Sequence, residues 1–270
     1  MNKILEFLLF LFVKFLKWQD KKLESMAIRA TKWTGRSEMP IHPKHLYDSN
    51  RNKFLRESIN KGIIFLDVGS GVGTECLYAA KNGANMVYGI EKNAILVEHS
   101  IQKLNALSVN FEIFKLDLEQ ANIPLDDKSV DLINFSNVLE HLNNRIAILQ
   151  ELSRLLHPNG CLVVSIPNRS SPWKVLQRKA GIDSRDDPDH KIEYDIETLY
   201  DEFNVSGLEI CSPLNPIVPS LPINGMIALT AAFSPKLYKN LQNWKVRYAA
   251  KNPKHSVGWV LLATVKKPNI

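Results

Sequence analysis

Residues 65–73 read Phe-Leu-Asp-Val-Gly-Ser-Gly-Val-Gly, a stretch in which one aspartate precedes three glycines. Glycine has no Cβ, so the main chain at Gly69, Gly71 and Gly73 can approach a bound molecule closely, and the start of a following helix favours negative groups. The spacing is G-x-G-x-G, whereas a dinucleotide fingerprint is G-x-G-x-x-G, and Thr74 stands where its third glycine belongs. Taken alone, the stretch fits a ligand loop or a tight strand-to-helix turn equally well.

Three acidic residues each stand at or just beyond the end of a predicted strand. The strands are predicted over 63–68, 86–90 and 109–114, and the acidic residues are Asp67, Glu91 and Asp117. Ligands of open parallel sheets bind at the carboxyl ends of the strands, and an acid downstream of the glycine turn is suited to ribose hydroxyls. We therefore expect one pocket bounded by the glycine turn and these three carboxylates.

A fourth strand, predicted over 130–135, runs into Ser136-Asn137-Val-Leu-Glu-His-Leu. Four motifs thus follow one another: the glycine stretch at 67–73, Glu91, Asp117-Leu118 and the segment that starts at Ser136. In this order they resemble the motifs of the class I S-adenosylmethionine-dependent methyltransferases, in particular the small-molecule, type 11-like group. The resemblance covers residues 60–212 and the final strand. It implies S-adenosyl-L-methionine as cofactor, with the glycine motif around its methionine part, Glu91 at the ribose and Asp117 at the adenine.

The cofactor-binding residues implied by this resemblance lie in all four motifs. They are Asp67, Gly69, Ser70, Gly71, Gly73, Glu91, Lys92, Asp117, Leu118, Ser136 and Asn137. The implied fold is α/β, with the seven-stranded, mostly parallel sheet of the class I methyltransferase (Rossmann-like) type. Alternating strands and helices independently favour such a sheet.

The expected domain organisation follows from where this pattern begins and ends. Residues 1–36 are predicted to form an N-terminal amphipathic helix and linker, and residues 37–270 the methyltransferase domain. The fifth strand is predicted over 160–166 after a His-Pro-Asn-Gly turn, and the last strand over 257–265 pairs with 208–211. Residues 213–256 form an insertion between the last two strands, uncharged and proline-rich in its first half and basic with interleaved aromatic residues in its second.

Candidates for acid–base chemistry are His190, His141 and Tyr194. A base matters chiefly when the methyl acceptor is a hydroxyl of high pKa. His190 precedes a predicted helix and resembles a histidine that faces the acceptor in related bacterial enzymes, although a loop-anchoring role is open. His141 belongs to the fourth motif, where the resemblance favours support of the cofactor wall over direct acid–base chemistry.

No metal is expected. The end of the fourth strand carries Ser136-Asn137 instead of the aspartate of catechol-type magnesium sites, and the three cysteines lie singly in apolar patterns. Isolated thiols at positions 76, 161 and 211 provide no zinc motif and predict buried packing.

Charge is unevenly distributed along the chain, whose net charge is +6. Residues 1–36 carry +5 and residues 210–270 carry +8, so the middle, 37–209, carries −7. Two basic ends suggest an anionic partner surface, either lipid headgroups or nucleic acid. The absence of an Asn/Asp-Pro-Pro-Tyr or Pro-Cys motif after the fourth strand disfavours methylation of nucleic-acid bases.

The first helix favours the lipid interpretation. Residues 3–18 are almost entirely apolar, with their few charged residues in one sector of the helix. At 1.5 Å per residue the run is about 22 Å long, shorter than a bilayer's ~30 Å apolar core. We therefore expect it to lie in a membrane interface. A secretory signal or a helix packed on the protein or on a partner subunit is the competing interpretation.

The sequence as a whole predicts a methyltransferase acting on a hydroxyl, or a carbon, of a hydrophobic or lipid-linked small molecule. The expected location is the cytoplasm, peripherally on the inner face of a membrane. Alternatives are a soluble tailoring enzyme of a sugar or glycan precursor, and a catalytically inactive cofactor-binding scaffold. The sequence leaves the acceptor and the oligomeric state open.

Overall fold

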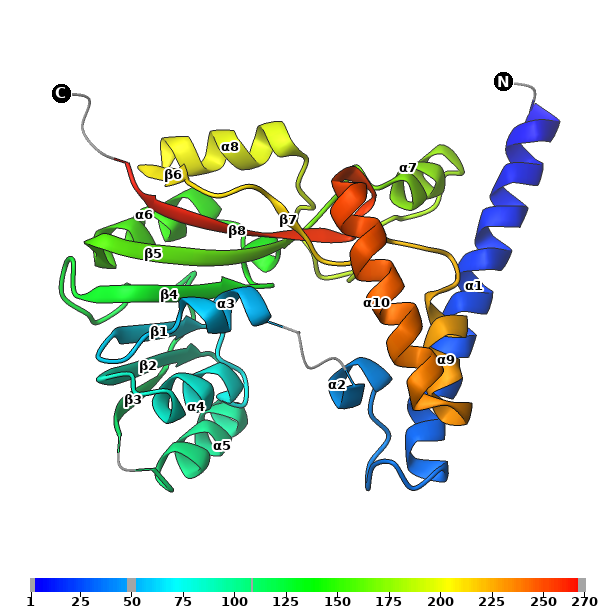
Figure 1. Cartoon of the computed structure of the whole chain (residues 1–270). Coiled ribbons are helices and arrows are strands. Elements are labelled where there is room, and N and C mark those ends of the chain that lie inside the picture. Colours follow the sequence, from blue (N-terminus) through cyan, green and yellow to red (C-terminus); the bar gives the residue numbers. More distant parts are fainter. Residues whose placement is uncertain (1–2, 48–51, 108, 267–270) are drawn as a thin grey trace. The chain divides into compact units, whose positions relative to one another are not determined.

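The structure is a computed structural model that describes residues 3–47, 52–107 and 109–266 (Figure 1). It divides into two compact units. The sheet unit comprises Asn52–Pro167, Asp187–Leu214 and Trp259–Ile270, and the helical unit comprises Met1–Arg51, Asn168–Asp186 and Asn215–Gly258. The predicted boundary between residues 36 and 37 does not coincide with this division.

The sheet unit confirms the predicted α/β class and its mostly parallel sheet. Its strands are β1 (Ile64–Val68), β2 (Met86–Glu91), β3 (Asn110–Lys115), β4 (Val130–Ser136), β5 (Leu156–Pro167), β6 (Leu208–Ile210) and β8 (Gly258–Val265). Their order is β3-β2-β1-β4-β5-β8-β6, with β3, β2, β1, β4 and β5 mutually parallel. As predicted, β6 runs antiparallel to β8, with Leu208 opposite Val265.

Helices cover both faces of this sheet (Figure 1). They are α3 (Lys53–Ser58), α4 (Thr74–Lys81), α5 (Ala94–Leu104), the 3-10 helix η1 (Leu139–His141), α6 (Arg145–Leu155) and α8 (Ile196–Val205). Successive strand residues point to opposite faces. Phe65 therefore packs in the cluster that includes Leu55, Ala79 and Leu104, whereas Leu66 packs with residues of α6 and α8.

The His-Pro-Asn-Gly turn predicted before the fifth strand, at residues 157–160, lies within the strand itself. β5 begins at Leu156, four residues earlier than predicted, and the register shifts so that Val130 pairs with Leu156 but Leu132 with Cys161. The residues between Leu156 and Cys161 therefore form an irregularity in the ladder. His157 Nδ1 accepts the Asn159 N–H at 3.2 Å within it, so the turn chemistry persists inside the strand.

The helical unit contains α1 (Lys3–Trp33), α2 (Pro43–Tyr47), α7 (Pro172–Lys179), α9 (Asn224–Phe233), α10 (Pro235–Lys251) and the 3-10 helix η2 (Pro253–His255). The two-residue strand β7 (Asn215–Pro216) pairs with β8, so the sheet has eight strands within the described residues, one more than predicted. The insertion thus supplies α9 from the uncharged first half and α10 from the basic, aromatic second half.

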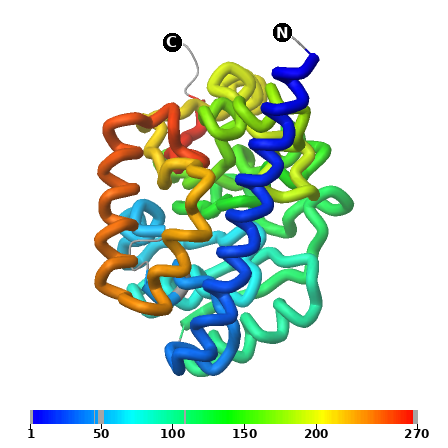
Figure 2. Tube along the Cα trace, turned by 90° about the vertical axis from the view of Figure 1, so that its right-hand side faces the viewer, coloured from blue at the N-terminus to red at the C-terminus, as the bar shows by residue number. Residues whose placement is uncertain are grey.

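The first helix is twice as long as the apolar run that predicted it, since α1 continues to Trp33 (Figure 2). Residues 19–33 contain many good helix formers, and the first glycine, Gly35, lies beyond the helix at a φ of 66°. α1 packs on α9 where Gly225 meets it: the Gly225 N–H donates to Asp20 Oδ1 at 2.6 Å. A Cβ at Gly225 would lie 2.1 Å from the Asp20 carbonyl oxygen, so only glycine permits this approach.

Among the described residues, none of the helices combines the length and hydropathy needed to span a bilayer. The cysteines follow the packing prediction only in part. Cys76 is buried, Cys161 is half-buried and Cys211 is exposed. Cys211 lies just after β6 on the sheet's edge, where its N–H donates to the Leu262 carbonyl while the thiol remains at the surface.

Candidate active site

The glycine turn after β1 requires glycine at all three positions. Gly69, Gly71 and Gly73 have φ values of 75°, 53° and 72°, a region that disfavours residues with a Cβ. Gly69 and Ser70 both donate N–H groups to the Ile90 carbonyl at 2.9 Å, which ties the turn to the end of β2. At Gly69 a Cβ would also lie 2.5 Å from Val138 Cγ2, because the segment after β4 covers the turn.

Glu91 links the glycine turn to the second strand. Its Oε2 accepts the Gly71 N–H at 3.0 Å and its Oε1 accepts the Asn93 N–H at 2.8 Å. The carboxylate therefore stands at the carboxyl end of β2 beside the turn, the place that the sequence predicted. In this position the carboxylate can accept hydrogen bonds from ligand hydroxyls, either in addition to these two bonds or in place of them.

Asp67 is the most deeply buried of the three predicted acids, with 3% of its surface exposed. Asn134 Nδ2 donates to its Oδ1 at 2.7 Å, and the Cys76 thiol lies 3.6 Å from Oδ2. Burial raises the pKa of Asp67 to about 6, against the lowering effect of the Asn134 hydrogen bond. A carboxylate held ionised in so buried a place favours a positively charged neighbour.

The remaining predicted cofactor residues lie along the same edge of the sheet. Asp117 follows β3, and its Oδ1 accepts the Glu119 N–H at 3.1 Å. Leu118 packs against the core, and Lys92 is exposed just after β2. Ser136 Oγ donates to Asn134 Oδ1 at 2.6 Å, which connects the fourth motif to Asp67 through one amide.

Asn137 takes a left-handed backbone conformation, with φ at 56°. Asparagine tolerates this region better than most residues, and such strained positions cluster at functional sites. Its N–H donates to the Ser165 carbonyl at 3.0 Å, so the chain turns sharply from β4 towards η1. This turn is what brings Val138 over Gly69.

The arrangement fits a sulfonium nucleoside. A Cβ at Gly71 would meet no atom within 4 Å, so the turn faces open space where a ligand can approach its backbone. Among the described residues, Ser70 Oγ is buried without a hydrogen-bond partner, as a group with a ligand partner would be. Acids at the ends of three neighbouring parallel strands provide partners for ribose, amine and sulfonium groups.

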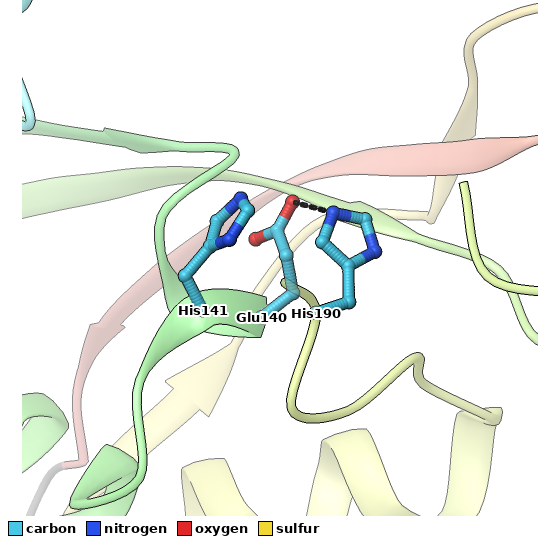
Figure 3. Close-up of side chains that lie close together, drawn as sticks. All are labelled: Glu140, His141 and His190. Atoms are coloured by element: carbon cyan, nitrogen blue, oxygen red, sulfur yellow. Dashed lines mark ion pairs between the residues drawn. The ribbon is translucent and has the colours of Figure 1, made fainter. Parts of the chain in front are cut away.

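The structure brings together two of the three candidate bases. His141 belongs to η1 and His190 to the loop before α8, and their ring centroids lie 4.7 Å apart. Glu140, which the sequence analysis did not select, lies with them (Figure 3). Its position beside His141 in the fourth motif was visible, but only the fold brings it to His190, fifty residues later.

Tyr194 has a different environment. Its side chain is fully buried and its hydroxyl donates to Glu202 Oε2 at 2.6 Å, while Arg145 pairs with the same carboxylate at 3.0 Å. Burial raises the pKa of the Tyr194 phenol, so this group stays protonated at neutral pH. The geometry thus favours a structural hydrogen bond between the loop and α8 over the role of proton acceptor.

Comparison with known proteins places residues 39–212 in a family described as "Methyltransferase domain". The chain belongs to this family. Its cofactor is S-adenosylmethionine, and its sheet unit has the fold of the S-adenosylmethionine-dependent methyltransferases.

Similar proteins include an arginine N-methyltransferase, number 8-B, of Danio rerio, 29% identical over 205 residues that make up 72% of this chain and 46% of the relative. The chain spans about half the length of the curated relatives it matches. A methyltransferase structure from Listeria monocytogenes covers 82% of this chain and 100% of its own, with 15% identity and a TM-score of 0.56. That of a magnesium protoporphyrin IX methyltransferase from Synechocystis, with bound SAH, covers 83% of each chain with 17% identity and a TM-score of 0.53.

Proposed function

We propose that this protein transfers the methyl group of S-adenosylmethionine to a hydroxyl, or a carbon, of a hydrophobic or lipid-linked small molecule at an anionic membrane surface. Its place would be the cytoplasm, on the inner face of a membrane. The observation that carries the methyl-transfer half is the hydrogen bond between Glu91 and the Gly71 N–H, which joins two predicted cofactor motifs into one wall.

Methyl transfer is an in-line displacement in which the new bond to the acceptor forms as the carbon–sulfur bond breaks. Alignment of the two reactants supplies much of the acceleration. In this chain the rigid glycine turn and Glu91 would hold the nucleoside, and buried Asp67 would favour the positively charged end of the cofactor. Val138, which lies over Gly69, would restrict the mobility of the methionine part.

The membrane half rests on the helical unit. This unit has 21 Lys or Arg residues against 7 Asp or Glu residues, a net charge of +14, whereas the sheet unit has 13 against 21, a net charge of −8. Basic residues near an anionic bilayer contribute about 1 kcal/mol each. A strongly basic unit attached to an acidic catalytic unit suits a protein that docks on anionic lipids through one part only.

The orientation of α1 supports the same proposal. Polar residues near its middle turn towards the rest of the helical unit: Lys17 Nζ donates to the Asp183 carbonyl and Asp20 accepts from Gly225. The opposite face is apolar and exposed. It consists of Ile4, Leu5, Phe7, Leu8, Leu11, Phe12, Phe15 and Trp18, each at least 45% exposed. Apolar faces of this size on a helix mark interaction sites, and this one suits an acyl boundary.

Three alternatives differ in the acceptor or in the chemistry. A soluble enzyme that methylates a sugar or glycan precursor would leave the apolar face of α1 for an oligomer contact. A protein acceptor is the second alternative, because the curated relatives are named protein arginine N-methyltransferases. An inactive scaffold would bind the cofactor without turning it over.

Cofactor binding and turnover are tested with the full chain. We expect calorimetry to detect S-adenosylmethionine binding, and methyl-labelled cofactor to label the lipid fraction of a membrane extract. Label confined to the soluble glycan or protein fraction would replace the lipid acceptor with one of the alternatives. Binding without any labelled product would support the scaffold.

Membrane binding is tested by flotation with vesicles of phosphatidylcholine and phosphatidylglycerol. Truncation of α1 is a poor test, because it would remove the Asp20 contact with Gly225. The double variant Phe12→Glu/Phe15→Glu changes residues that are 58% and 56% exposed, and we expect it to lose at least about tenfold in vesicle partitioning. The matched control is Ile95→Glu/Val205→Glu in the sheet unit, with both residues 64% exposed. Equal flotation of the two double variants would refute the membrane role of α1.

A further inference from the structure

Glu140, His141 and His190 form a cluster with the chemistry of a metal site. Each offers one ligand atom, and these atoms all lie within 4.8 Å of one another (Figure 3). His190 Nε2 lies 4.0 Å from Glu140 Oε1, and the two imidazole rings meet edge to face. Two imidazoles and one carboxylate are a donor set typical of catalytic zinc and of other divalent transition metals.

A second carboxylate faces each imidazole from outside the cluster. Glu193 Oε1 lies 3.4 Å from His190 Nδ1, and Asp189 Oδ2 lies 3.3 Å from His141 Nδ1. Metal-binding histidines commonly donate one ring N–H to a carboxylate in this way, which leaves the other nitrogen unprotonated for the metal. With Nδ1 of each ring donating to its outer carboxylate, Nε2 is the nitrogen left for a metal.

The main chain holds the two contributing segments together. The Lys191 N–H donates to the Glu140 carbonyl at 2.7 Å, and the Ile192 N–H reaches the same oxygen at 3.3 Å. The loop that carries His190 is therefore fixed directly to η1, which carries the other two residues. Such a brace keeps the spacing of three ligands independent of side-chain flexibility.

Burial and charge also favour a cation at this place. Glu140 and Glu193 are 1% and 7% exposed, so two carboxylates are withdrawn from water around one imidazole. A dication lowers the cost of such buried negative charge. The side chain of His141 is 30% exposed, which leaves the cluster accessible from one side. A three-ligand site with an accessible side is the form that catalytic metals take.

The cluster also lies close to the cofactor residues along the chain. Val138, which covers Gly69, precedes Glu140 by two residues, and η1 follows β4 at the edge that carries Asp67 and Glu91. A cation bound here would therefore stand beside the wall of the cofactor site.

We propose that Glu140, His141 and His190 bind one divalent transition-metal ion, best represented by Zn²⁺, and that this ion takes the acceptor hydroxyl into its open position. The proposal rests on the proposed methyl transfer. The metal would lower the pKa of the hydroxyl. The acceptor oxygen releases its proton to solvent and forms the bond to the methyl carbon, and the sulfur leaves with the electron pair of the broken bond as S-adenosylhomocysteine. The prediction from sequence that no metal is used considered the end of the fourth strand and the isolated cysteines. It did not consider Glu140 and His141 together with His190, which lies about fifty residues further along the chain.

The test measures metal binding apart from activity. The full chain is stripped with a chelator and titrated with Zn²⁺ in competition with a chromophoric chelator, and we expect one tight site per chain and no comparable Mg²⁺ site. Glu140→Gln and His190→Gln should abolish that site, and Glu193→Gln should weaken it by about 10- to 100-fold. His99→Gln, an exposed histidine of α5, is the control that should bind as the parent does.

Two measurements keep the outcome unambiguous. X-ray absorption at the zinc edge should show nitrogen and oxygen ligands without sulfur, and Cys211→Ser should leave the site intact, because Cys211 is an exposed thiol that could bind zinc. S-adenosylmethionine binding, measured on the same samples, reports whether each variant is folded. His141→Gln, at a partly exposed residue, serves if the buried variants do not fold.

Undiminished zinc binding by Glu140→Gln and His190→Gln, or no zinc bound by the parent, would overturn the metal site. Failure of the parent chain to bind S-adenosylmethionine would instead overturn the proposed methyl transfer. The two failures are therefore distinguishable.

Discussion

The two compact units place their apolar side chains in opposite ways. Of the large hydrophobic residues that are exposed in the described part of the chain, 17 belong to the helical unit and 6 to the sheet unit. The sheet unit instead buries its apolar residues on both sides of the strands and gathers polar groups at one edge. The candidate active site thus lies in the acidic sheet unit, whereas the basic helical unit has the exposed apolar surface on which the proposed membrane attachment rests.

The units also differ in how a glycine is used. In the sheet unit, Gly69, Gly71 and Gly73 take left-handed conformations that shape a turn for a ligand. In the helical unit, Gly225 lies within a helix and serves only close packing of α9 on α1. Substitutions at the two kinds of glycine should therefore separate the stability of one unit from the ligand affinity of the other.

The largest effect is expected from Gly225→Ala. Its Cβ would lie 2.1 Å from the Asp20 carbonyl oxygen and 2.7 Å from the Glu24 nitrogen, both backbone atoms that cannot rotate away. We expect α9 to separate from α1 at a cost of at least about 3 kcal/mol in the free energy of unfolding of the helical unit. Limited proteolysis within α1 should become much faster, while calorimetry should find S-adenosylmethionine affinity within about twofold of the parent.

Ala228→Gly is the control for Gly225→Ala. Ala228 is also a buried residue of α9, but its replacement by glycine adds no atoms between the helices. Loss of cofactor affinity in Gly225→Ala would show that the two units are not energetically separable.

The sheet unit was the part that sequence could predict. Apolar strands of regular spacing, glycines that need positive φ and acids at strand ends are local signals. The bounds of β1, β2 and β3 and the pairing of β6 with β8 were predicted to within a residue or two. Periodicity also found the apolar face of α1. It could not find where α1 ends, because residues 19–33 are helical by propensity without an apolar run.

What sequence missed depends on contacts between distant segments. Glu140 becomes a candidate site residue only because the fold places it beside His190. Asn134 likewise becomes one only because the packing of neighbouring strands lets it donate a hydrogen bond to Asp67. Tyr194 was selected by its type alone, and only its burial against Glu202 reveals a structural contact. The His-Pro-Asn-Gly segment carried a correct turn signal, but the ladder accommodated it within β5.

Asp67 provides the next largest effect. Since burial raises its pKa to about 6, the folded state holds a proton that the unfolded chain releases near pH 4. Ionised Asp67 therefore destabilises the fold by up to about 3 kcal/mol above pH 6, and this cost disappears below pH 4. Asp67→Asn should be the more stable protein at pH 8, with the difference shrinking as the pH falls to 4, and should bind S-adenosylmethionine more weakly.

Urea unfolding of both proteins between pH 4 and 8 measures this difference. Glu112→Gln, an exposed acid of β3, is the control expected to show no such trend. A constant difference between Asp67→Asn and the parent across the whole range would contradict the buried-carboxyl explanation.

A somewhat smaller effect is expected from Gly69→Ala. The new Cβ would lie 2.5 Å from Val138 Cγ2 and would need a φ of 75°. We expect the segment after β4 to move off the turn and S-adenosylmethionine affinity to fall by about 10- to 100-fold. Gly62→Ala is the matched control, because Gly62 also has a positive φ, 83°, but no atom within 4 Å of its Cβ position. It should lose stability without losing affinity, and comparable affinity losses in the two variants would contradict the close approach of Val138.

The smallest effect separates the position of charge from its amount. Lys236 and Arg247 are exposed on α10 of the helical unit, and Lys81 and Lys115 are exposed in the sheet unit. Reversal of either pair to glutamate changes the net charge equally, but only the α10 pair should weaken partitioning onto anionic vesicles, by about tenfold. The difference should disappear in about 1 M salt, where the Debye length is near 3 Å. Equal losses from both reversals would mean that net charge, and not a basic unit facing the lipid, governs attachment.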